Sequence, residues 1–137
     1  MKSAARILGV VGANLTMIQA ASIVFDNQYS VLDENYILRV YGQAVFNLAC
    51  QIIPVRMAQD CQEQPSAEVA ELMGSSSEEA QTVMLAGILA RAQKTDKLPL
   101  AEVRPFLRRQ TELLRFTPGG DPDIYQAVTQ YLYGALS

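Results

Sequence analysis

Residues 7–25 read ILGVVGANLTMIQAASIVF and carry no charge, with Arg6 before them and Asp26 after them. A stretch this apolar can be a cleaved signal, a membrane span, or a helix buried inside a protein or a protein assembly. Each of these three possibilities would assign the chain to a different class of protein. The segment therefore constrains the fold more than any other feature of the sequence.

Polar residues inside the segment favour burial in protein. Asn14 and Gln19 would lie close to the centre of a bilayer, where each amide needs a hydrogen-bonding partner. We therefore predict a helix buried on all sides, within the fold and at a subunit contact. Asn14, Leu15, Ile18 and Gln19 are its expected partner-binding residues. The alternative is a small membrane-associated subunit anchored by residues 7–25.

Composition excludes several chemistries. The 137 residues suit one domain, and the net charge of −3 gives no overall attraction to nucleic acid. Histidine is absent, which removes the commonest general base and the commonest zinc ligand. No phosphate-binding glycine loop or calcium-binding loop occurs in the sequence. We therefore expect no catalytic residue, no metal site and no cofactor, and we predict that the chain is not an enzyme.

The two cysteines, Cys50 and Cys61, lack the spacing of a metal or redox motif. On a continuous helix they would lie about 16 Å apart, too far for a disulfide unless the chain folds back after Pro54. Reduced, buried thiols and a cytoplasmic location are the expectation.

Helical signals dominate the rest of the chain. We predict an all-α fold of five to seven helices, forming a single domain over residues 1–137. The expected helices cover residues 3–25, 33–53, 67–73, 77–93, 99–116 and 122–134. Pro54 is expected to kink or end the second of these, with a helical continuation to residue 62. The core is expected from both long N-terminal helices and the last helix.

Capping signals define several of these boundaries. Ser76 and Glu79 form the pattern of a capping box, and Asp121 followed by Pro122 is typical of a helix start. Residues 23–32 are the one ambiguous stretch. They are consistent with a short β-hairpin or with a plain loop between helices.

The helix expected after residue 33 has a second face rich in amides. Gln43, Asn47 and Gln51 follow Arg39 at four-residue intervals, whereas apolar residues occupy the opposite side. Amides suit a surface that packs against protein, because they form hydrogen bonds without the cost of burying a charge. We list the three amides as partner-binding residues. A solvated face rich in glutamine is the alternative.

Charge is unevenly distributed in the second half of the chain. Residues 1–60 are poor in charge, whereas the half from 61 to 137 separates its acids from its bases. Residues 60–79 hold six acids and no base, and residues 91–115 hold seven bases and three acids. Arg104, Arg108 and Arg115 share one helical stripe. We refer to these three residues as the basic stripe.

The basic stripe is expected to contact an acidic protein surface, such as the 60–79 segment of a neighbouring copy. Nucleic acid is the less favoured partner, because aromatic residues do not alternate with the arginines. A solvated basic face is the remaining alternative. Together these features predict a non-enzymatic interaction protein: a helical subunit, adaptor or small chaperone that binds a protein partner or further copies of itself.

Overall fold

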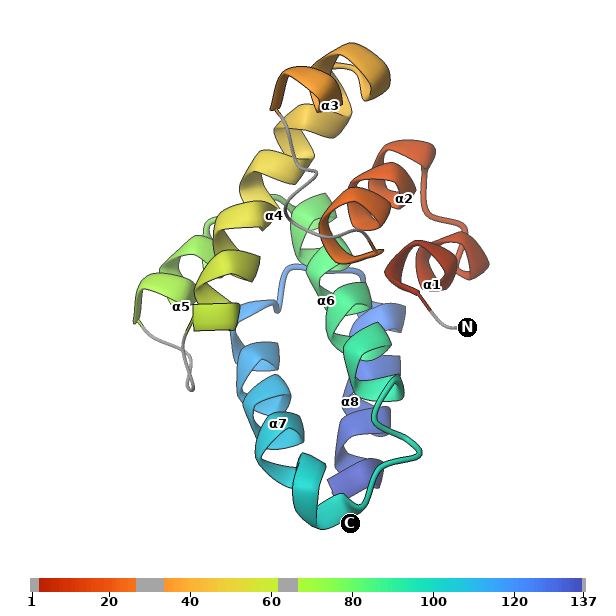
Figure 1. Cartoon of the computed structure of the whole chain (residues 1–137), viewed down its shortest axis with the longest axis vertical. Helices are drawn as coiled ribbons and strands as arrows, with labels where there is room; N and C mark the ends of the chain where they lie inside the picture. Colours follow the sequence, from red (N-terminus) through yellow and green to blue (C-terminus); the bar gives the residue numbers. More distant parts are fainter. Residues whose placement is uncertain (1–2, 27–33, 62–66, 137) are drawn as a thin grey trace.

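A computed structural model describes the backbone of residues 3–26, 34–61 and 67–136. Figure 1 shows a bundle of helices with the C-terminus at its lower end. The α-helices are α1 (Ala4–Val10), α2 (Leu15–Ala21), α3 (Glu34–Tyr41), α4 (Gln43–Cys61), α5 (Ala67–Gly74), α6 (Glu78–Gln93), α7 (Leu100–Leu113) and α8 (Pro122–Leu136). A π-helical turn, Ser22–Asp26, follows α2, and a 3-10 turn, Leu114–Phe116, follows α7.

The all-α prediction is confirmed. The described ranges contain eight α-helices and no strand, so the helix count exceeds the predicted maximum by one. Residues 23–25, which would start the alternative β-hairpin, are π-helical instead. Residues 27–32 of that hairpin lie outside the described residues.

The prediction of one continuous helix through residues 7–25 is wrong. Gly12 has a φ of +79°, a left-handed conformation that ends α1. Asn14 then caps α2, since its Oδ1 accepts a hydrogen bond from the Met17 backbone N–H at 3.0 Å. The uncharged stretch is therefore two short helices and a turn. Among the described residues, no helix combines the length and the apolar character that a membrane span requires.

A second glycine divides the next predicted helix. Gly42 has a φ of +94° and separates α3 from α4, where the sequence suggested one helix from residue 33 to residue 53. The expected helical continuation after Pro54 is present, but Pro54 does not end the helix, since α4 runs through it to Cys61. The predicted start at residue 33 and the predicted restart at residues 65–66 lie outside the described residues.

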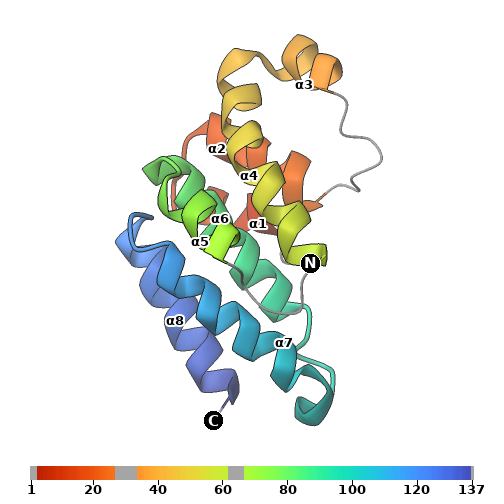
Figure 2. The ribbon, with the colours of Figure 1, turned by 90° about the vertical axis from the view of Figure 1, so that its left-hand side faces the viewer.

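Helix α6 forms the centre of the fold. Every side chain from Ala80 to Ala90 is buried, and α1, α2, α4, α7 and α8 pack around the helix. Figures 1 and 2 both show α6 in the interior of the bundle, with α7 and α8 on one part of its surface and the N-terminal helices on another. The predicted core omitted this helix, although the last helix and the N-terminal helices do contribute to it.

A glycine in α6 lets an aromatic ring approach closely. A Cβ atom placed on Gly87 would lie 2.6 Å from the ring of Phe25, well inside van der Waals contact. Phe25 lies in the π-helical turn that follows α2. The missing side chain at Gly87 therefore allows the end of the N-terminal segment to pack directly on the central helix.

Two polar side chains of α6 attach the turn between α7 and α8. Gln81 accepts a hydrogen bond from the Gly119 N–H at 2.8 Å and donates one to the Ser76 carbonyl at 3.0 Å. Thr82 accepts one from the Asp121 N–H at 2.8 Å. Both side chains are buried. Their hydrogen bonds therefore satisfy groups that would otherwise be costly to bury.

The predicted start of the last helix is confirmed. The Asp121 carboxylate accepts hydrogen bonds from the N–H groups of Asp123 and Ile124 at 2.9 and 3.2 Å. Pro122 takes the first helical position, where its missing N–H costs nothing. Because Thr82 holds the Asp121 backbone, this cap also fixes where α8 begins against α6.

We predict that Gln81→Leu lowers the free energy of unfolding by about 1–3 kcal/mol, because it removes two hydrogen bonds, one to the Gly119 N–H and one to the Ser76 carbonyl. Gln126→Leu is the matched control, since Gln126 is exposed on α8. Urea denaturation of both variants measures the difference. Equal stability of the two would contradict the proposed importance of the Gln81 hydrogen bonds.

Candidate interaction surfaces

Two of the predicted partner-binding amides form hydrogen bonds at the start of α6. Asn14 donates from Nδ2 to the Glu79 carboxylate at 3.2 Å. Gln51 accepts at Oε1 from the Ser77 N–H at 2.9 Å. These two amides therefore join α2 and α4 to the first turn of α6.

The predicted capping box at this helix start is wrong by one residue. Ser77 is the N-cap, and its hydroxyl accepts a hydrogen bond from the Ala80 N–H at 3.2 Å. In a capping box, the side chain three residues after the N-cap accepts a hydrogen bond from the N-cap N–H. Here Gln51 of α4 accepts that hydrogen bond from Ser77 instead. Ser76 instead donates its hydroxyl hydrogen to the Leu72 carbonyl at the end of α5, at 2.6 Å.

Large apolar side chains are exposed where α1 turns into α2. Val10, Val11 and Leu15 are 83%, 50% and 66% exposed. We call these three residues the α1–α2 corner. Ile18 and Gln19, one turn further along α2, are half-buried, and Ile18 packs against the core.

The predicted amide stripe is divided between the surface and the fold. Gln43 and Asn47 are exposed on α4 and bind each other through a 2.7 Å hydrogen bond from Nε2 to Oδ1. Arg39 lies on α3, beyond the break at Gly42. Gln51 is half-buried at the contact with α6. The four residues therefore do not form one continuous helical stripe.

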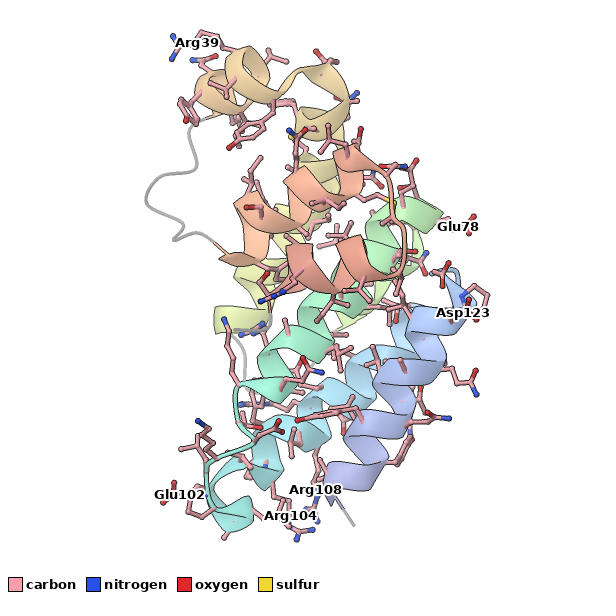
Figure 3. The ribbon with its side chains drawn as sticks, turned by 90° about the vertical axis from the view of Figure 1, so that its right-hand side faces the viewer. Arg39, Glu78, Glu102, Arg104, Arg108 and Asp123 are labelled. Atoms are coloured by element: carbon pink, nitrogen blue, oxygen red, sulfur yellow. The ribbon has the colours of Figure 1, made fainter. Side chains whose placement is uncertain are left out.

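The basic stripe also separates into different environments. Arg104 is half-buried, and its Nη1 donates to the Leu136 carbonyl at the end of α8, at 3.5 Å. Arg108 and Arg115 are exposed. Within the described part of the chain, neither of these two has an ion-pair partner. Figure 3 places Arg104 and Arg108 at the lower end of the molecule, far from Glu78.

Acidic residues gather where α6 and α8 begin. Glu78 and Glu79 occupy the first turn of α6, and Asp123 follows the cap of α8. Figure 3 shows Glu78 and Asp123 on the same side of the molecule. Carboxylates at helix N-termini are stabilised by the unpaired N–H groups there. Among the described residues, no three metal-ligating side chains are grouped so that they could hold an ion.

An apolar groove between α1, α6 and α8 was not anticipated from the sequence. Its volume is about 450 Å³. Its apolar lining consists of Ile7, Val10, Val11, Leu89, Ile124 and Ala127. Arg6, Gln93 and Asp123 provide its polar atoms. Because the lining comes from three helices far apart in the sequence, no local pattern could have identified the groove. We call this site the groove.

The Cys50 thiol is less nucleophilic than that of an unperturbed cysteine. Its side chain is exposed and forms no disulfide, so the expectation of a buried thiol is wrong at this position. Partial burial of the thiol raises the pKa of Cys50, and the negative charge of Glu34 raises it further. A raised pKa lowers the thiolate fraction at neutral pH and therefore the nucleophilicity of the group.

No protein-family model matches this chain, and no curated protein or solved structure is significantly similar to it.

Proposed function

We propose that this chain is a non-enzymatic protein-interaction protein, a helical subunit, adaptor or small chaperone of a larger assembly. Its partners bind through the charge-poor N-terminal helices and the basic stripe. The exposed apolar residues of the α1–α2 corner are the observation that carries the proposal.

The α1–α2 corner suits a protein contact for two reasons. First, its three side chains lie within six residues of the sequence and are exposed, although the chain buries many other apolar side chains in its core. Clustered apolar side chains on a surface mark sites of association more often than isolated ones do. Second, the adjoining Asn14 is already hydrogen-bonded to Glu79. A protein that covers the corner therefore does not leave this amide without a hydrogen bond.

The surrounding residues favour binding over catalysis. The chain has no histidine, and its exposed cysteine has a raised pKa. The acids at the starts of α6 and α8 stabilise helix termini, which accounts for their positions. These observations support a role in which surfaces, and not reactive groups, perform the function.

We predict that Leu15→Asp removes the partner while leaving the fold intact. Leu15 is 66% exposed, so the substitution should change stability by no more than about 0.5 kcal/mol. A charge at this position must be desolvated when a partner covers it, which weakens binding. Affinity purification of the tagged chain at its native expression level should then lose the protein that co-purifies with the wild type.

Leu98→Asp is the matched control for this experiment. Leu98 is 52% exposed, and it lies just before α7, in a different segment of the chain from the α1–α2 corner. Its variant should retain the partner. Equal recovery of the partner by the Leu15 and Leu98 variants would show that the α1–α2 corner is not the binding surface.

The exposed arginines of the basic stripe are proposed to guide association. Complementary charges raise the rate of encounter more than they raise affinity, and each exposed pair contributes about 0.2–1 kcal/mol. The double variant Arg108→Glu and Arg115→Glu should therefore bind the recovered partner more slowly. Its melting temperature should remain that of the wild type.

Association rates measured at low and high salt test this role. The difference between wild type and the double variant should shrink as salt screens the charges. If the rates and their salt dependence are the same for both proteins, the arginines form only a solvated face.

A further inference from the structure

We propose that α3 of one copy docks into the groove of a second copy, with Arg39 of α3 beside Asp123 at the rim of the groove. This inference rests on the proposed interaction function and identifies a partner for it. The partner is the chain itself. The contact is a helix in an apolar groove, a recurring mode of protein recognition.

Helix α3 lies at the periphery of the fold (Figure 1). It packs chiefly on α4, and Ile37 is its only buried side chain. Tyr36, Leu38 and Val40 are 45%, 39% and 52% exposed. Tyr36 and Val40 are separated by four residues and so share one face of the helix. That face has the apolar character of a helix that binds in a groove.

The groove has matching properties. Its walls are mostly apolar, and Val10, at its edge, is 83% exposed. Gln93 lines it as well, and the Oε1 atom of that residue is buried without a hydrogen-bond partner. An orphaned acceptor of this kind is costly. A docked helix that lets the Gln93 side-chain amide rotate and form a hydrogen bond would recover part of that cost.

A second copy is required because α3 cannot reach its own groove. Figure 1 shows α3 at the top of the molecule, beyond α4 and α2, whereas α1 and α8 lie lower. Figure 2 shows the same separation from the side. Two apolar surfaces on one chain that do not contact each other can be covered together when two copies associate.

Charge specifies the orientation of the contact. Arg39 is the only base in α3, and within the described residues it has no ion-pair partner. At the rim of the groove, Asp123 lies on the side of the molecule that also carries Glu78 (Figure 3). An arginine beside this acidic rim is favourable, whereas the reverse orientation would place it near Arg6.

When each copy docks its α3 into the groove of the other, the result is a closed dimer. Each copy then contributes one helix and one groove, and the two contacts are related by a two-fold axis. The expected mass is twice the 15.0 kDa of the chain. Light scattering coupled to size-exclusion chromatography should show this mass for the purified wild type and a shift to monomer on dilution.

A charge exchange tests the pairing of Arg39 with Asp123. Arg39→Asp alone and Asp123→Arg alone should each raise the dimer dissociation constant roughly tenfold, because two attractive pairs become two repulsive pairs. Mixing the two variants should restore a heterodimer of wild-type affinity, since both contacts then pair opposite charges. Lys97→Asp is the matched charge reversal outside the contact, and it should not change the dissociation constant.

Two further variants test the apolar part of the contact. Ala127→Trp fills the groove, and Val40→Asp places a charge on the docking face. Both residues are exposed, so circular dichroism and melting temperature should remain those of the wild type. Each variant alone should be monomeric.

The inference is overturned if the purified wild type is monomeric at all concentrations, or if the mixture dimerises no better than its components. It is also overturned if the groove and α3 variants dimerise like the wild type. A monomeric chain that still captures a different protein through the α1–α2 corner would leave the proposed function standing and would remove only self-docking. Loss of that capture by Ala127→Trp would then assign the groove to the foreign partner.

Discussion

The burial of α6 on all sides is the constraint on which the rest of the structure depends. A helix without a solvent-facing side cannot carry charge cheaply, and its residues 80–90 carry none. Its buried polar side chains must be paired, and Gln81 and Thr82 are paired with the turn that joins α7 to α8. The hydrogen bonds that satisfy these two side chains therefore also set the positions of the last two helices.

The surfaces available for association follow from this arrangement. The helices around α6 turn their apolar faces inward, and Asn14 and Gln51 are used to connect α2 and α4 to its first turn. The α1–α2 corner, α3 and the groove are among the apolar features of the described residues that remain outside this packing. The exposed Arg108 of α7 then lies in a different part of the surface from Glu78 of α6 and Asp123 of α8 (Figure 3). Association through apolar contacts, oriented by charge, is the function that we propose for such a surface.

Helix composition and capping chemistry predicted the fold class and several boundaries, because these signals are local. The cap at Asp121 and the passage of a helix through Pro54 are examples. The breaks at Gly12 and Gly42 were not predictable, since Gly9 is helical and only the backbone conformation distinguishes it from Gly12. The central position of α6 was missed because residues 7–25 form a longer uncharged run. The groove depends on contacts between three distant helices, which no local pattern encodes.

Native-state hydrogen exchange tests the central position of α6 most directly. Amides that are buried on all sides exchange only when the whole protein unfolds, whereas those of a peripheral helix exchange through local opening. The slowest amides should therefore belong to residues 83–90 of α6, and those of α3 should exchange far faster under conditions in which the chain is monomeric. Slower exchange in residues 7–25 than in α6 would show that the N-terminal helices form the centre of the fold, and would contradict the arrangement described here.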